Sequence, residues 1–142
     1  MALKPFPASP DCGLLLLRVW LGVVGVLHGS QKLFGAFGGP GIKGFAGFLD
    51  SLHIPAPTAS AYAAALSELV GGLLIALGLW PRVAAIPVVL TMLVAWLTAH
   101  KGGFFAQAGG GEYPLTLAVA ALVIAIAGPG KWTITNITKE RP

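Results

Sequence analysis

Ionisable side chains interrupt long apolar stretches of this sequence. Arg18, His28 and Lys32 lie in the first stretch, and Glu68 lies near the middle of the second. Placing such a side chain in a membrane or an apolar core costs free energy, so each one is a functional candidate by default. Carboxylates and histidines can also transfer protons near neutral pH. We therefore predict that Glu68 and His28 are the catalytic residues.

Further polar side chains stand at the ends of the apolar stretches or share a helical face with these two. We predict a ligand-binding role for four of them: Lys32, His100, Glu112 and Arg18. If the stretches are antiparallel helices, most of these side chains gather toward the outer half of a bundle. An apolar pocket with a few convergent polar groups is the usual form of a small-molecule site, so we expect a quinone or a similar lipophilic ring there. The alternative is a solvated rim of unrelated polar residues.

Arg18 and Glu68 each lie among small residues. At 100° per residue, Arg18 and Lys32 share a narrow helical stripe with Gly22, Gly25 and Gly29. The helical neighbours of Glu68 are alanines and glycines. Small residues let helices approach closely, so both faces should line the bundle interior. We expect Arg18 and Glu68 to form a buried ion pair that fixes helix register; the alternative is that one of them binds or protonates a ligand.

Several kinds of chemistry are not indicated by the motifs. The sequence contains no H-x-x-H, H-E-x-x-H or C-x-x-C-H pattern, so no metal or haem is expected. Its one cysteine, Cys12, excludes thiol exchange within the chain. The basic residues are scattered rather than clustered, so nucleic-acid binding is not expected either.

The composition defines the class of protein that must position these side chains. Of 142 residues, 56% are apolar and 10% are charged, and the mean hydropathy is +0.82. These values exclude an ordinary soluble domain and an intrinsically disordered chain. The sequence predicts an all-α integral membrane protein of a single domain, 1–142, organised as a four-transmembrane-helix bundle. The expected elements are spans at about 13–34, 58–80, 82–99 and 113–128, a short interfacial helix at about 42–53, and a C-terminal tail at 129–142.

The interfacial helix rests on an amphipathic pattern, and a buried re-entrant segment or a plain loop is the alternative. Arg18 interrupts the first apolar stretch and no A-x-A pattern follows, so we expect this segment to be retained rather than cleaved. With four spans, both termini lie on one side. Basic residues collect on that side, which predicts cytoplasmic termini and a multi-pass protein of a bacterial-type plasma (inner) membrane. These residues are Lys4, Arg82, Lys131, Lys139 and Arg141.

Several short motifs carry a family resemblance. They are L-L-R-V-W ending at Trp20, H-G-S-Q-K-L at 28–33, S-E-L-V-G-G-L-L at 67–74, G-L-W-P-R ending at Arg82, and G-E-Y-P-L at 111–115. In these the chain resembles the DoxX family of small four-helix membrane proteins. The resemblance implies a membrane subunit of a thiosulfate:quinone oxidoreductase or of a redox-stress complex. The family often ends in an aspartate where this chain has Thr135, so no role of that aspartate is carried over.

Two functions from different classes follow. The first is a quinone-linked redox subunit that works with a partner oxidoreductase protein, because the chain shows neither a cysteine cluster nor a dinucleotide fingerprint to supply electrons. The second is a non-catalytic membrane module that escorts or anchors a partner protein or a hydrophobic small molecule. A transporter is a weaker third reading, because four spans leave little room for alternating access. Membrane lipid is a contact in every case. Whether the chain alone is an enzyme, and its oligomeric state, stay open.

Overall fold

The structure is a computed structural model that describes residues 9–139. Within these residues every regular element is a helix and no strand occurs, so the predicted all-α class is confirmed. Three helices are long and apolar enough to cross a membrane, and a fourth apolar helix is shorter, at 16 residues. The elements are α1 (Pro10–Phe34), η1 (Ala36–Gly38), α2 (Gly41–Ser51), α3 (Pro57–Leu77), α4 (Pro81–Ala99), η2 (Ala106–Ala108), α5 (Glu112–Ala127) and α6 (Ile134–Lys139).

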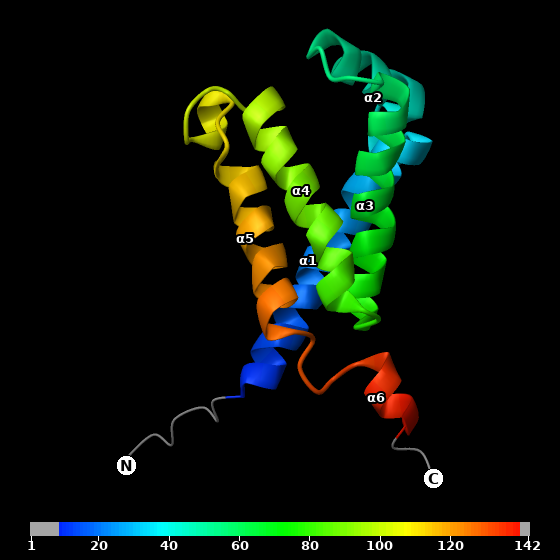
Figure 1. Cartoon of the computed structure of the whole chain (residues 1–142), viewed down its shortest axis with the longest axis vertical. Helices are drawn as coiled ribbons and strands as arrows, with labels where there is room; N and C mark the ends of the chain where they lie inside the picture. The colour runs from blue at the N-terminus through cyan, green and yellow to red at the C-terminus, as the bar shows by residue number, and fades with distance from the viewer. Residues whose placement is uncertain (1–8, 140–142) are drawn as a thin grey trace.

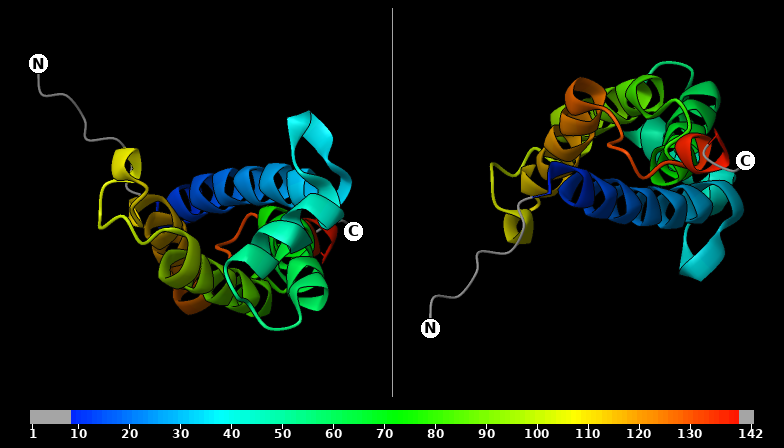
Figure 2. Two further views of the ribbon diagram at one scale, coloured as in Figure 1. Left: turned by 90° about the horizontal axis from the view of Figure 1, so that it is seen from above. Right: turned by 90° about the horizontal axis from the view of Figure 1, so that it is seen from below.

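The four apolar helices run alternately up and down, as Figure 1 shows. The turn between α3 and α4 lies at the lower end, together with the start of α1 and with α6, whereas α2 and η2 lie at the upper end. Packing is most extensive between α1 and α3 and between α4 and α5, and α3 joins the two pairs by packing on α4. By contrast, α1 makes little contact with α5. Views along the bundle show the same arrangement (Figure 2).

A stripe of glycines determines how closely α1 approaches α3. A Cβ added at Gly29 would lie 2.5 Å from the backbone nitrogen of Leu69, and one added at Gly25 would lie 2.7 Å from the carbonyl oxygen of Glu68. Contacts this short leave no room for a side chain, so the helix backbones touch. The small face predicted for the first apolar stretch therefore does pack inside the bundle.

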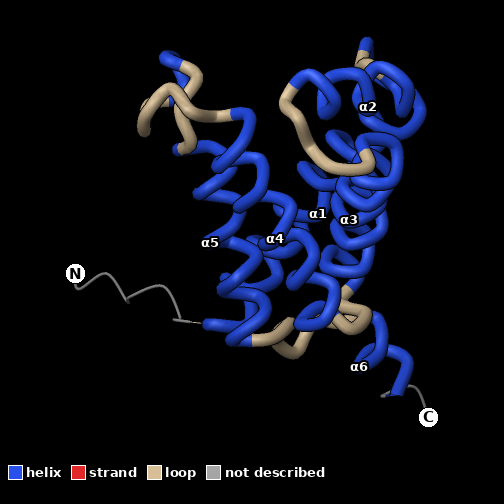
Figure 3. The backbone as a smooth tube through the Cα atoms, turned by 45° about the horizontal axis from the view of Figure 1, so that its top comes forward, coloured by secondary structure: helices blue, strands red, loops and turns tan. Residues whose placement is uncertain are grey.

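Helix boundaries follow the local chemistry. Pro10, Pro57 and Pro81 are the first residues of α1, α3 and α4, where the missing N–H group costs nothing. Gly35 and Gly78 end α1 and α3 in the left-handed region, each with a φ of 72°. The tube drawing in Figure 3 shows a short turn between α3 and α4 and longer irregular segments between α4 and α5 and between α5 and α6.

The expected segment 42–53 forms α2, which packs on α1 and α3. Its Phe45 is buried and its Phe48 is about half exposed, in keeping with the amphipathic pattern. The C-terminal tail is more ordered than the sequence suggested, because it contains α6. The Asp11 side chain accepts a hydrogen bond from the Lys131 backbone N–H at 3.0 Å and lies 3.7 Å from the Lys131 ammonium. The tail is thereby attached to the start of α1.

Candidate functional site

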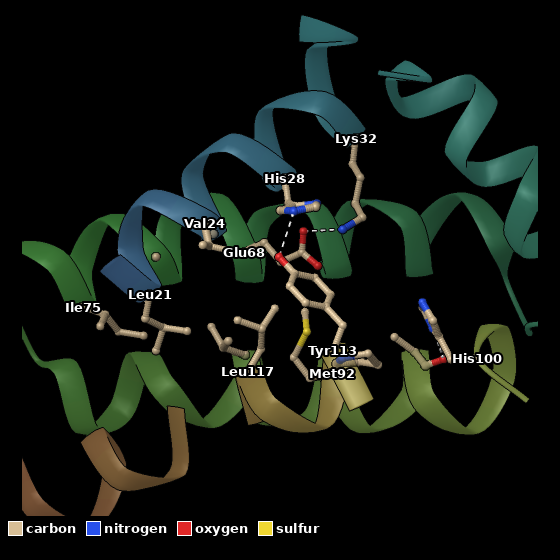
Figure 4. A pocket seen from close by; sticks show the side chains of 15 residues that line it. Leu21, Val24, His28, Lys32, Glu68, Ile75, Met92, His100, Tyr113 and Leu117 are labelled. Carbon is tan, nitrogen blue, oxygen red and sulfur yellow. Dashed lines mark hydrogen bonds and ion pairs between the residues drawn. The ribbon is translucent and has the colours of Figure 1, made fainter. Parts of the chain in front are cut away.

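A cavity of about 240 Å³ lies between the two helix pairs, and its polar residues lie toward the upper end of the bundle. Most of its wall is apolar, and its polar side chains come from α1, α3, α5 and the end of α4 (Figure 4). The lining residues are Leu21, Val24, Gly25, His28, Lys32, Glu68, Gly72, Ile75, Val88, Met92, Ala95, His100, Tyr113, Pro114 and Leu117.

An ion pair between Lys32 and Glu68 forms one side of the cavity. The Glu68 side chain is 4% exposed and the Lys32 side chain is 22% exposed, so the pair is largely out of water. The Lys32 ammonium also lies 5.5 Å from the centre of the Phe45 ring of α2, within range of a cation–π contact. Lys32 has three N–H donors, and Glu68 is the single hydrogen-bond partner it has among the described residues. The remaining donors are available to a ligand.

His28 and Tyr113 lie next to each other beside the Glu68 carboxylate, on the side away from Lys32, as Figure 4 shows. The Tyr113 hydroxyl lies 3.2 Å from Nε2 of His28, and the two ring centres are 6.0 Å apart. This hydrogen bond joins α1 to α5, two helices that otherwise pack against each other sparsely. Tyr113 was not predicted as a site residue, although it lies in the G-E-Y-P-L motif. A tyrosine at the start of an apolar helix is typical of a residue that anchors the helix at the membrane interface. The sequence therefore gave no sign that Tyr113 lines a cavity.

His100 also lines the cavity, at the upper end of α4. Its Nδ1 lies 3.0 Å from the carbonyl oxygen of Ala95, so the ring continues the hydrogen bonding of the helix end. In that arrangement Nδ1–H donates and Nε2 remains free for another partner.

Glu112 and Arg18, the other two predicted ligand residues, do not line the cavity. Glu112 is the first residue of α5 and half-buried, where a carboxylate favourably meets the positive end of the helix dipole. The cavity wall begins one residue later, at Tyr113.

Arg18 lies at the lower end of the bundle, and the predicted ion pair between Arg18 and Glu68 is wrong. Arg18 and Lys32 lie seven residues before and after Gly25, which touches Glu68, so each is about 10 Å from it along the helix. Side chains on a helix lean toward its N-terminus. Lys32 therefore leans toward Glu68 whereas Arg18 leans away from it, and spacing alone could not distinguish the two.

The arrangement combines a ring-sized apolar space with a set of hydrogen-bond donors and one carboxylate at its upper end. No group of three or more histidine, cysteine, aspartate or glutamate side chains that could hold a metal ion occurs in the part of the chain that the structure describes. Such a site can bind an uncharged lipophilic molecule that carries hydrogen-bond acceptors, and it can exchange protons with it.

The fold and this cavity define a multi-pass helical membrane protein with an internal cavity. More particularly, the chain belongs to the DoxX family, whose model matches residues 13–101. It is 31% identical to a Bacillus subtilis (strain 168) protein named "Putative oxidoreductase CatD", over 84% of this chain and 82% of that protein. It is 29% identical to the "Uncharacterized membrane protein Rv3486" of Mycobacterium tuberculosis (strain ATCC 25618 / H37Rv), over 95% of this chain and 84% of that protein. No solved structure matches the chain significantly.

Proposed function

We propose that this protein is the membrane subunit of a quinone-linked redox system, of the thiosulfate:quinone oxidoreductase or redox-stress type, and that it binds a quinone or a similar lipophilic ring in the cavity. The main support for this proposal is that four polar side chains converge at one end of a mostly apolar cavity. They are Lys32, Glu68, His28 and Tyr113. The name of the B. subtilis relative agrees with a redox role.

The size and polarity of the cavity suit such a ring. An apolar cavity of about 150 Å³ can hold benzene, so about 240 Å³ accommodates one substituted ring. The apolar wall, with Ile75, Val88 and Leu117, would contact the ring faces. The spare N–H groups of Lys32 would donate hydrogen bonds to a ring carbonyl.

The chemistry supplied by a bound quinone is the acceptance of electrons and protons at its carbonyl oxygens. In this proposal Lys32 and Tyr113 would hold and polarise such an oxygen, while Glu68 and His28 would hold and exchange the proton. Glu68 also orients the Lys32 ammonium through their ion pair. The electrons come from a partner oxidoreductase protein, because the sequence has no cysteine cluster or dinucleotide fingerprint.

The proposal includes a topology. We infer that α1, α3, α4 and α5 all cross a bacterial-type plasma membrane and that both termini are cytoplasmic. The alternation of the helices supports it, because the start of α1 and α6 lie at the same end. The basic residues near the two chain ends support the orientation. In this arrangement the polar end of the cavity lies in the outer half of the bundle.

A pair of neighbouring valines allows a sharp binding test. Val24 lines the cavity, whereas Val23, the next residue on α1, is 42% exposed on the outer surface of the bundle. Val24→Phe should fill the cavity and abolish binding of a short-tailed benzoquinone or naphthoquinone. Val23→Phe, the matched control, should bind like the unmodified protein. Tryptophan fluorescence quenching reports the Kd, because Trp96 follows directly on the cavity residue Ala95.

The polar end is tested by His28→Ala, which should weaken binding about tenfold, as expected for the loss of one good hydrogen bond in a buried site. The proposal fails if both quinones bind equally well to the Val24→Phe, Val23→Phe and His28→Ala proteins. Together with intact folding, that result would favour the non-catalytic binding module instead.

A further inference from the structure

Arg18 is a buried cation without a partner in the described chain. The residue is 2% exposed, and its Nε and Nη1 atoms are buried without a hydrogen bond to any described atom. A guanidinium buried in this way costs several kcal/mol unless an anion or hydrogen-bond acceptor compensates it. The lower end of the bundle therefore has a donor group that lacks its acceptor.

The carboxylates that the structure describes do not supply this acceptor. Glu68 pairs with Lys32, and Asp11 contacts Lys131. Asp50 in α2 and Glu112 at the start of α5 lie at the upper end of the bundle. The missing anion must therefore come from outside the described residues.

A second buried polar side chain lies beside Arg18. Nη1 of Arg18 and the side chain of Thr133 both lie within 3 Å of the point that a Cβ on Gly78 would occupy. Thr133 is 3% exposed, and its hydroxyl accepts a hydrogen bond from the Asn136 backbone N–H at 3.1 Å. The Thr133 atoms nearest to that point are Cβ and the Cγ2 methyl carbon, so this side chain covers the Arg18 guanidinium and does not satisfy it.

This region lies at the depth of a membrane surface. Trp80 lies in the turn between α3 and α4, Trp132 lies just before α6, and Trp20 lies two residues before Gly22, which packs against Ala76 near the end of α3. The three side chains are 81%, 53% and 66% exposed, respectively. Exposed tryptophans gather at the level of lipid headgroups. The headgroup phosphate is the abundant anion at that level, and the planar guanidinium of arginine matches phosphate oxygens in geometry and charge.

We propose that the Arg18 guanidinium binds a phosphate group, and that it is the headgroup phosphate of an anionic phospholipid in the leaflet at the lower end. The site is covered by the loop that carries Thr133 and by α6, which lies below the end of α3 in Figures 1 and 2. Within the described residues, α6 does not pack extensively on any other helix. A headgroup can thus reach Arg18 by displacing a peripheral segment instead of a core helix. This site is separate from the cavity and does not depend on the redox proposal.

The test compares the melting temperature of the full-length protein, stripped of lipid in a neutral maltoside detergent, with and without phosphatidylglycerol. Saturating phosphatidylglycerol should raise the melting temperature by about 5 °C, because a ligand that binds only the folded state stabilises it. Arg18→Met should abolish this rise. Without lipid, Arg18→Met should melt at the same or a higher temperature, because it removes an uncompensated buried charge. Arg82→Gln is the matched control, since it removes a cation at the same end that already bonds the Ala127 carbonyl oxygen, and it should keep the rise.

Two further additions separate the sources of phosphate. Inorganic phosphate that reproduces the shift would support the site but assign it to a free anion, whereas an effect confined to phosphatidylglycerol assigns it to lipid. Diacylglycerol, which has no phosphate, should have no effect. An equal rise in the unmodified and Arg18→Met proteins would overturn the proposal. A second result would also overturn it: a large loss of stability in lipid-free Arg18→Met, together with an equal loss in Glu140→Gln. Glu140, which lies outside the described residues, would then be the partner of Arg18. If Arg18→Met does not fold, Arg18→Gln replaces it with the same expectations.

Discussion

Breaking the Lys32–Glu68 ion pair is the most direct test of how the site is built. In Lys32→Met the methionine keeps most of the apolar side-chain volume but removes the ammonium. Glu68, with a side chain 4% exposed, would then be an uncompensated carboxylate at the centre of the bundle. We expect this variant to be strongly destabilised.

The magnitude follows from burial. Removing one partner of a buried pair costs about 3–5 kcal/mol, whereas replacing both partners with apolar residues is close to neutral. At about 2–4 °C for each kcal/mol, Lys32→Met and Glu68→Leu should each lower the melting temperature by about 6–20 °C. The Lys32→Met/Glu68→Leu double variant should recover most of that loss. The exposed Lys131–Asp11 pair is the matched control, and Lys131→Met should change the melting temperature by less than about 2 °C.

The assay is thermal unfolding in detergent, followed by tryptophan fluorescence and analysed as a double-mutant cycle. A second cycle uses Arg18→Met with Glu68→Leu, and its two effects should add, because Arg18 lies at the other end of the helix pair. Additive effects of Lys32→Met and Glu68→Leu would refute the pairing described here. Strong coupling between Arg18→Met and Glu68→Leu would refute the separation of the two sites.

Three further predictions concern packing and orientation. Gly29→Ala should lower the free energy of unfolding by about 1–3 kcal/mol, because the added Cβ would lie 2.5 Å from a backbone nitrogen of α3. Gly13→Ala is the control and should be neutral or stabilising, because nothing lies within 4 Å of its Cβ. Thermal unfolding compares the two variants. Ser67 and Thr91 share a hydrogen bond of 2.6 Å between α3 and α4, so Thr91→Val should cost about 0.6 kcal/mol in the same measurement and much less when Ser67 is already alanine. Reporter fusions after the last residue and within 101–111 should report opposite sides of the membrane, and a common side would show that α5 does not cross it.

Much of the fold could be predicted because hydropathy and helix-breaking residues act locally. Prolines mark where α1, α3 and α4 begin, glycines mark where α1 and α3 end, and the glycine stripe of α1 identified its buried face. The site was harder to predict, because it depends on how side chains lean. Lys32 and Arg18 are equally distant from Glu68 along α1, and only the direction of the Cα–Cβ bonds distinguishes them.

Two other features depended on contacts between distant segments. Tyr113 reaches His28 across the gap between α1 and α5, and a sequence gives no measure of that gap. Likewise α6 is short and follows a glycine- and proline-rich loop, so its local pattern resembles a tail. Its place beneath α3 is set by tertiary contacts such as the one between Thr133 and Gly78.

The Lys32–Glu68 pair also has a consequence for how the chain enters the membrane during its synthesis. An isolated charged residue at the centre of a helix opposes insertion by about 2.5–3.5 kcal/mol, and α3 is the least hydrophobic of the three long helices. Because α1 is synthesised first, the partner of Glu68 is already in place when α3 emerges. Insertion of α3 should therefore depend on Lys32, and replacing that lysine should leave part of the newly made chains with α3 outside the bilayer.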